Sequence, residues 1–178
     1  MKRAAVLLLA GVAGLAACDE PEQKQIPAPA TPVVTSTAAP VELKAGEVVL
    51  DFPADEADVK RCEIFRGRAA LPADKTILIG VRNKDNGNPE RYFGLVTDWE
   101  YPKDLATWTG PQWFGDKDSA AGQSFRVEIL IIDLKLATKL NKETKVDGWH
   151  SRENPQGTTV AAHVDLNRVK GSGPADCS

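Results

Sequence analysis

Two histidines are the residues of this chain best suited to acid–base chemistry. His150 lies in the stretch DGWHSRENPQG, where Ser151 and Glu153 would supply a nucleophile and an acid. Such triads depend on geometry, because sequence neighbours seldom face each other productively. His163 lies on the polar side of a predicted strand, beside Asp165. A hydrolase using His150 or His163 is therefore the alternative hypothesis. No nucleophile elbow, HExxH helix, phosphate loop or CxxC accompanies them, so we assign no catalytic residue.

A possible metal loop is the segment Asp116–Gln123, DKDSAAGQ, in which Asp116 and Asp118 alternate as in a calcium loop. An EF-hand needs more oxygen ligands and a closing Glu at its twelfth position. Counted from Asp116, that position is Val127. We expect a polar turn that enters the strand containing Phe125, with no metal and no cofactor.

The most unusual stretch is Asp98–Gly115, DWEYPKDLATWTGPQWFG, which contains five of the chain's 11 aromatic residues. Its prolines and glycines predict a loop-like excursion rather than a regular strand. Rings displayed on a rigid scaffold stack on sugars or anchor a protein partner. Alternatively, they cap one open end of the core. Under the first interpretation, the candidate binding residues are Trp99, Tyr101, Trp108 and Trp113.

The amino-terminal residues contain a processing motif. Lys2 and Arg3 precede a run of 14 apolar or small residues that ends at Ala17. This run is shorter than the ~20 residues that a spanning helix needs, and a charged head before an apolar core is the layout of a signal peptide. The following stretch, LAAC, closely resembles the lipobox of bacterial lipoproteins. The resemblance covers residues 1–18 and implies cleavage before Cys18, whose thiol would carry a diacylglycerol, together with an acyl chain such as palmitate on the new amine.

Such an anchor places the mature protein at a cell membrane, facing the extracytoplasmic side. Two or three acyl chains give stable anchoring, whereas one holds only marginally. Residues 18–45 form a tether rich in Pro, Ala and Thr that we expect to be extended and solvated. Cleavage removes Lys2 and Arg3, so the net charge falls from −3 to −5. An acidic chain without a basic cluster is a poor ligand for nucleic acid.

Cysteine usage points to one disulfide. With Cys18 lipidated, Cys62 and Cys177 remain as an even pair in an exported protein. No His or second Cys stands beside either thiol, which disfavours a metal site. We predict a disulfide between Cys62 and Cys177 that ties the carboxy-terminal tail to an early strand.

Alternating apolar residues predict that residues 46–178 form one mainly β domain. Asn86-Gly87 is a strong turn signal, so the runs before and after it should form a hairpin. Inward-facing residues are expected in the first strand (Val48, Leu50, Phe52) and in the last (Val160, Ala162, Val164, Leu166). Further strands are expected at residues 62–65, 76–81, 92–96 and 123–133.

The strand at residues 123–133 has an irregularity in its pattern. Phe125, Val127, Ile129 and Ile131 share one face, but the apolar phase slips after Ile131. A one-residue slip exchanges the two faces, which predicts a bulge or a crossing between sheets near residues 130–133. A short helix from Leu134 to Asn141 is the competing interpretation.

Together these patterns predict a single antiparallel β-sandwich, with a flattened barrel as the alternative and at most one short helix. The predicted function is a binding or interaction module, presented on a lipid tether to an envelope protein or a cell-wall glycan. An envelope hydrolase remains the alternative.

Overall fold

The computed structural model describes residues 42–116, 118–143, 149–174 and 177. The predicted signal peptide, Cys18 and the tether up to residue 41 lie outside the described residues. Within the described part, no helix is both long and apolar enough to cross a membrane.

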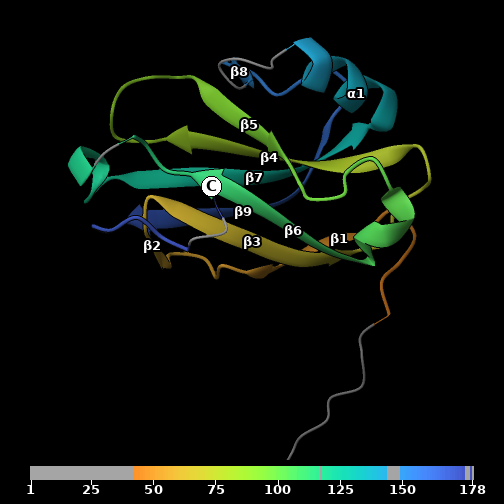
Figure 1. The fold of residues 1–178 in the computed structure, drawn as a ribbon, viewed down its shortest axis with the longest axis horizontal. Coiled ribbons are helices and arrows are strands. Elements are labelled where there is room, and N and C mark those ends of the chain that lie inside the picture. The colour runs from red at the N-terminus through yellow and green to blue at the C-terminus, as the bar shows by residue number, and fades with distance from the viewer. Residues whose placement is uncertain (1–41, 117, 144–148, 175–176, 178) are drawn as a thin grey trace, which may run out of the picture. The chain divides into compact units, whose positions relative to one another are not determined.

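The described strands form two sheets that face each other without closing into a barrel (Figure 1). The three-stranded sheet has the order β1 (Val48–Phe52), β3 (Cys62–Ala69) and β6 (Thr107–Trp113). The six-stranded sheet has the order β2 (Asp58–Val59), β9 (Thr159–Arg168), β7 (Ser124–Asp133), β4 (Lys75–Asn83), β5 (Arg91–Leu95) and β8 (Trp149–Ser151). All the described pairs are antiparallel except β2 with β9. The predicted antiparallel sandwich is confirmed.

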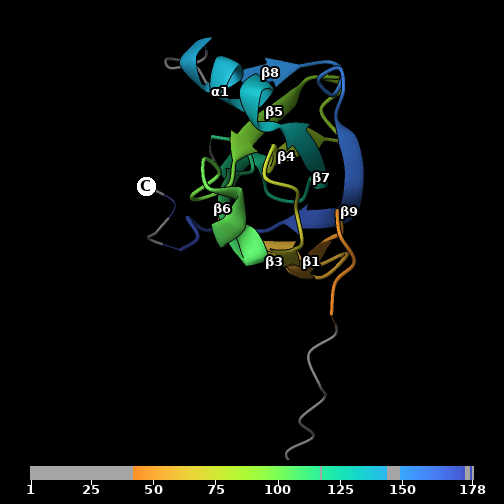
Figure 2. The same cartoon turned by 90° about the vertical axis from the view of Figure 1, so that its right-hand side faces the viewer.

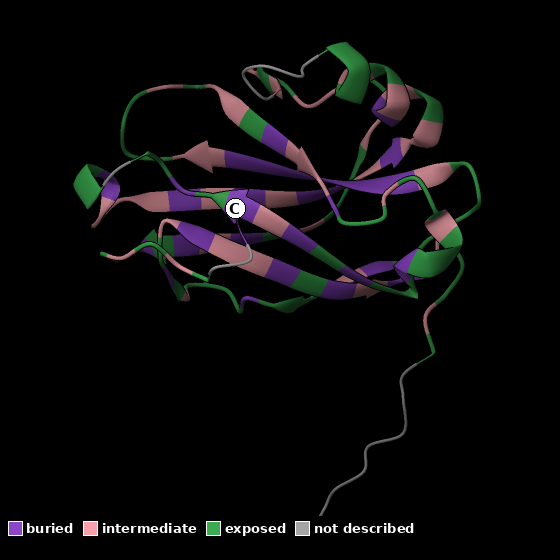
Figure 3. Ribbon diagram, in the orientation of Figure 1, coloured by how far each residue is buried: buried purple, intermediate pink, exposed green. Residues whose placement is uncertain are grey.

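The main core lies between the two sheets. Alternate residues of β7 face inward, and buried positions recur along both β4 and β7 (Figure 3). Phe65 belongs to β3 in the opposite sheet, and Phe114 directly follows β6. The centroids of these two rings are 6.2 Å apart. Phe114 also meets Phe125 of β7 edge-on, at 5.3 Å. These rings join the two sheets by burial of apolar surface.

A second core lies on the outer face of the six-stranded sheet, beneath helix α1 (Leu134–Glu143). Figure 2 shows α1 on the side of this sheet that faces away from β1 and β3. Leu130 and Ile132 of β7 pack there with Ala137 of the helix. The competing prediction of a helix from Leu134 is confirmed, whereas β7 itself carries no bulge, since it pairs with β4 in unbroken register. The pairing with β9 does shift between Ile129 and Leu130, but the extra residue there is Ala161 of β9. The apparent phase slip thus reflects the helix that covers the second face.

Two residues predicted to face inward are exposed, and a bulge explains each one. Val160 pairs with Leu130, so it lies on the outer face once Ala161 has been skipped. In β1 the register shifts between Leu50 and Phe52, which puts Phe52 opposite Arg66. The Arg66 guanidinium lies 5.7 Å from the Phe52 ring. Both predictions were wrong because a one-residue bulge reverses the alternation.

The aromatic stretch is only partly a loop. Residues 98–106 turn and form a short 3₁₀ helix, η1 (Pro102–Ala106), but Thr107–Trp113 is the regular strand β6. The prediction of an irregular excursion is wrong for this second half. Pro111 sits opposite Ile64 on a strand with a free edge, where a residue without an N–H is tolerated.

The hairpin prediction holds, since β4 and β5 pair antiparallel around a turn in which Gly87 has a φ of 70°. The segment after Asp116 contains the short 3₁₀ helix η2 (Asp118–Ala120), in keeping with a polar turn before β7. The aspartate of this turn, Asp118, accepts a backbone hydrogen bond from Gly171 at 3.3 Å.

The carboxy-terminal tail crosses the start of β3. Arg61 and Cys62 donate their backbone N–H groups to Gly171 and Ser172, at 2.9 and 3.2 Å. Cys62 is joined to Cys177 as a disulfide, with Cα atoms 6.1 Å apart. The two residues are separated by 115 positions in sequence. A cross-link over so long a loop stabilises the fold by about 4–5 kcal/mol in the chain-entropy model.

Candidate functional site

The four candidate aromatic residues occupy different environments and do not form one platform. Trp108 is 2% exposed and lies in the main core. Trp99 is half-buried against both cores, and its carbonyl oxygen accepts the hydroxyl of Thr76 at 2.8 Å. Tyr101 and Trp113 are 60% and 46% exposed. Capping of the core therefore describes Trp108 and Trp99, and Trp108 is excluded as an exposed stacking ring.

Strand alternation and one glycine explain why Trp108 is buried. Trp108 pairs with Gly67, and a Cβ at Gly67 would overlap the indole ring. The indole of Trp108 occupies the space that a side chain at position 67 would need. Five residues later, Trp113 lies on the outer face, where the Arg61 guanidinium sits 5.1 Å from its ring centroid.

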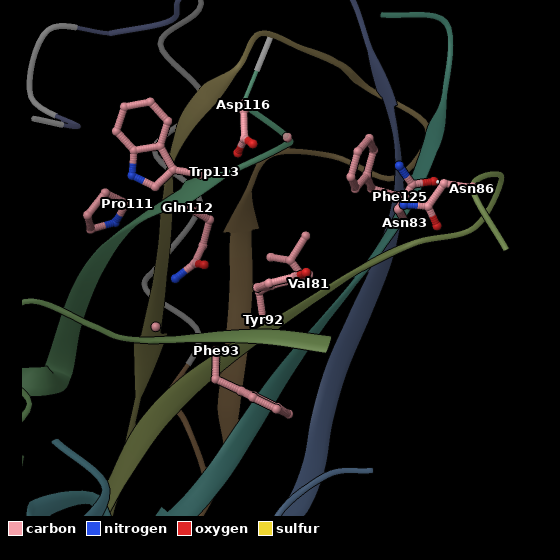
Figure 4. A pocket seen from close by; sticks show the side chains of 12 residues that line it. Val81, Asn83, Asn86, Tyr92, Phe93, Pro111, Gln112, Trp113, Asp116 and Phe125 are labelled. Carbon is pink, nitrogen blue, oxygen red and sulfur yellow. Dashed lines mark hydrogen bonds between the residues drawn. The ribbon is translucent and has the colours of Figure 1, made fainter. Parts of the chain in front are cut away.

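A cleft of about 600 Å³ lies between the sheets beside β5 and β6 (Figure 4). These two strands belong to different sheets and meet at one end, where the Thr97 N–H donates to the Thr109 carbonyl at 2.7 Å. Tyr92, which is 52% exposed, is an aromatic residue of this cleft that remains open to solvent, and Trp113 borders the cleft with its ring on the outer face of β6. Cavities of this size hold small-molecule ligands in many proteins.

Gln112 is the most unusual residue of the cleft. It is 6% exposed, and in Figure 4 its side chain points from β6 towards β5, while Pro111 and Trp113 lie on the other side of the strand. The amide lies over Gly94, where a Cβ would overlap its nitrogen. Among the described residues, Nε2 has no hydrogen-bond partner. A buried donor without a partner costs about 1–3 kcal/mol.

The surroundings of this amide are mostly apolar. Val81 and Phe125 line the cleft as buried residues of the main core. Asn83 also lines the cleft, but its amide nitrogen donates to Gln123 at 2.7 Å and its oxygen accepts the N–H groups of Asp85 and Asn86. Its side chain therefore shapes the turn, and Gln112 supplies the buried polar group of the lining whose nitrogen has no partner among the described residues.

Gln112 was missed from the sequence although an indication was present. In β6 the inward positions are Trp108, Gly110 and Gln112, followed by buried Phe114. A glutamine among inward apolar positions is a buried polar residue in need of an explanation. The pattern was hidden because Pro111 suggested a loop.

The two histidines are far apart. His150 on β8 and His163 on β9 are separated by β7, β4 and β5. Four strand spacings amount to roughly 19 Å. His150 is exposed, with Nδ1 3.0 Å from Oε2 of Glu90 and its ring centroid 5.7 Å from that of Tyr92.

The serine next to His150 does not face its imidazole ring. Ser151 follows it on β8, so strand alternation directs its side chain to the opposite face. The Ser151 hydroxyl oxygen accepts the Glu153 N–H at 3.3 Å. The arrangement pairs a base with an acid but directs the Ser151 hydroxyl away from the imidazole, so Ser151, His150 and Glu90 do not form a triad. In the described residues no three His, Cys, Asp or Glu side chains gather as a metal-binding group.

A charged network covers part of the outer face of the six-stranded sheet. Arg126 makes two hydrogen bonds to Asp165, at 2.6 and 2.9 Å, and Lys84 adds a third at 3.0 Å. The hydrogen bonds from Arg126, followed by that from Lys84, hold the pKa of Asp165 well below its usual range. These groups satisfy one another, so the network connects β7, β9 and the start of the β4–β5 turn.

The cleft is thus the feature that combines an accessible ring with an unsatisfied polar group, and it is formed by strands that are distant in sequence. The chain matches no family model, no curated protein and no solved structure.

Proposed function

We propose that this chain is a lipid-anchored envelope protein whose β-sandwich binds a protein or a cell-wall glycan in the cleft beside β5 and β6. The observation that carries the proposal is the buried Gln112 amide, whose nitrogen lacks a partner among the described residues and which lines a cleft together with the exposed Tyr92.

The energetics favour binding at this place. A ligand that accepts a hydrogen bond from Gln112 would recover the cost of an unmet donor, about 1–3 kcal/mol. Covering the exposed face of Tyr92 adds the hydrophobic contribution of a large ring. A polar group that fixes orientation within an apolar cleft is the usual composition of a ligand site.

The anchor is the second part of the proposal, and it is supported by the LAAC motif that ends at Cys18. A diacylglycerol thioether on Cys18 with an acylated amine would give the two or three chains that stable attachment requires. The proline-rich tether would then present the domain to ligands on the extracytoplasmic side of the membrane.

Binding is favoured over hydrolysis. The His150–Glu90 pair lies beside Tyr92, but the neighbouring Ser151 points away and His163 is four strands distant. A hydrolase needs polar groups that converge on one reacting atom, whereas this cleft offers one buried amide and an open ring face.

Site-specific photocrosslinking of the full-length chain in its native cell envelope tests the proposal. A benzophenone amino acid replaces Asn86, an exposed residue of the cleft, or Thr159, an exposed residue of β9 that does not line it. We expect an adduct on illumination from position 86 and none from position 159.

Two tyrosine variants make this test specific. Tyr92→Ala removes a ring from the cleft, while Tyr101→Ala removes another exposed ring that lies outside it. The adduct from position 86 should disappear with the first variant and persist with the second. Equal adducts from positions 86 and 159, or none from position 86, would refute binding in the cleft.

A further inference from the structure

The edge of β6 disfavours an extended peptide as the ligand. Residues of an antiparallel strand direct their backbone groups alternately to the paired strand and to the open side. The Thr109 carbonyl accepts a hydrogen bond from the Thr97 N–H, so the backbone groups of residue 109 point away from β3. Two residues further on, Pro111 occupies the next such position and has no N–H. A peptide that adds to β6 as another strand would therefore lack the hydrogen bond that a backbone N–H at position 111 would otherwise donate to it.

The charge of the cleft disfavours an anionic ligand. Among the described residues that line it, Asp116 is the one with a formal charge. The Asp116 side chain is exposed, and its backbone carbonyl accepts a hydrogen bond from Arg61 at 3.2 Å. A carboxylate at the mouth repels anions and accepts hydrogen bonds from hydroxyl groups. A neutral ligand rich in hydroxyl groups therefore fits this cleft.

The centre of the cleft requires a group that is polar on one side and apolar on the other. The Gln112 amide needs a carbonyl-type acceptor, and its terminal torsion is broad enough for the NH₂ to turn towards the cleft. Buried Val81 and Phe125 line the same space and can receive only an apolar group. An acetamido group carries a carbonyl oxygen and a methyl on one carbon, so it satisfies both.

We infer that the cleft binds a neutral N-acetylated sugar, a conclusion that rests on the proposed binding function and names its ligand class. The acetamido carbonyl accepts from Gln112, and the methyl lies against Val81 and Phe125. The sugar ring contacts Tyr92 at the mouth, where Asp116 accepts a hydroxyl.

Two disaccharides isolate the acetamido group. N,N′-diacetylchitobiose and cellobiose share the same β-1,4-linked frame and differ in that only the first carries acetamido groups. Each is titrated into the full chain in detergent and followed by calorimetry. We expect diacetylchitobiose to bind and cellobiose to bind at least about tenfold more weakly, the effect of one lost hydrogen bond.

Matched variants assign the effect to residues. Gln112→Leu should weaken binding of diacetylchitobiose by about tenfold, whereas Gln156→Leu, an exposed glutamine outside the cleft, should leave it unchanged. Because a core substitution can impair folding, Tyr92→Ala provides a second test at an exposed position, with Tyr101→Ala as its control. Tyr92→Ala should also weaken binding by about tenfold through the lost ring contact.

The outcomes separate the ligand class from the proposed function. Equal binding of the two disaccharides, or full binding by folded Gln112→Leu, overturns the acetamido inference and leaves the cleft as a glycan site. Failure of both sugars to bind, while the adduct from position 86 persists and depends on Tyr92, overturns the sugar class alone. Loss of both results rejects the sugar and the binding cleft together.

Discussion

Replacement of Trp108 by alanine should destabilise the domain strongly, because this ring fills the space between the two sheets. The indole is 2% exposed and lies over Gly67, whose missing side chain leaves room for it. Gly67 and its neighbours on β3 are held in a continuous ladder with β6, so the backbone has little freedom to close the cavity. Incomplete collapse is what makes large-to-small substitutions costly.

The magnitude follows from two opposing effects. Emptying a large aromatic site costs about 3–5 kcal/mol. The indole N–H of Trp108 has no partner among the described residues, so its removal relieves a burial penalty of about 1–3 kcal/mol for such a donor. Part of this penalty is already included in measured costs, so we expect a net loss of about 3 kcal/mol. Trp108→Phe keeps most of the ring and removes the N–H, and should cost only about 1 kcal/mol.

The control is Trp113→Ala, which removes the same side chain from the outer face of the same strand. This ring is 46% exposed and contacts Arg61. Its truncation should cost about 0.5–1 kcal/mol, the size of an exposed cation–π contact. The large difference between two tryptophans five residues apart is the expected result.

Urea denaturation followed by far-ultraviolet circular dichroism measures the effect, since fluorescence would change with the tryptophan itself. A loss of about 3 kcal/mol lowers the midpoint by about 1–3 M for slopes of 1–3 kcal/mol/M. A value for Trp108→Ala within about 1 kcal/mol of the wild type would refute the assignment of this ring to the core. If Trp113→Ala lowered the free energy of unfolding as much as Trp108→Ala, the assignment of the two rings to opposite faces of β6 would be refuted.

Three other substitutions have expected outcomes. Cys18→Ser should abolish incorporation of a clickable palmitate in cells, and equal labelling of wild type and variant would contradict the lipobox assignment. Cys62→Ala should lower the melting temperature and leave Cys177 open to alkylation, with a loss of up to about 4–5 kcal/mol; two alkylatable thiols in the native wild type would argue against the disulfide. Because Arg126 lowers the pKa of Asp165, this carboxylate stabilises the fold above the ordinary pKa of about 3.9 and loses that contribution as the pH falls below it. Asp165→Asn should therefore destabilise the domain at pH 7 and much less at pH 2 in thermal unfolding, whereas an equal cost at both pH values would contradict the ion pair.

Local patterns predicted most of the strands because each has one face against a core. The hairpin of β4 and β5 follows from Asn86-Gly87, and β7 follows from the period of two that begins at Phe125. Burial on both faces disturbed the pattern near Leu130, and α1 is the cause. The bulges at the ends of β1 and β9 were harder to predict, since a skipped residue depends on the partner strand.

The cleft could not be predicted from sequence for a related reason. Tyr92 and Gln112 come from different sheets and become neighbours only when β5 and β6 meet at Thr97 and Thr109. Pro111 is a strong local indication of a loop, and its tolerance here depends on β6 having a free edge. The alternation of inward and outward residues that identifies Gln112 as buried could therefore be recognised only once the order of the strands in the sheet was known.

Pro111 and Gln112 lie where the unpaired edge of β6 borders the cleft. A strand that borders a cleft keeps unpaired backbone groups, and such an edge invites pairing with another chain. Pro111 removes a donor at the position that faces the opening, which weakens that pairing without a covering element. The next residue, Gln112, then supplies a side-chain donor within the cleft in place of the missing backbone one. In the proposed site, recognition would therefore depend on one side-chain amide and its surroundings, and not on backbone groups that any extended peptide could match.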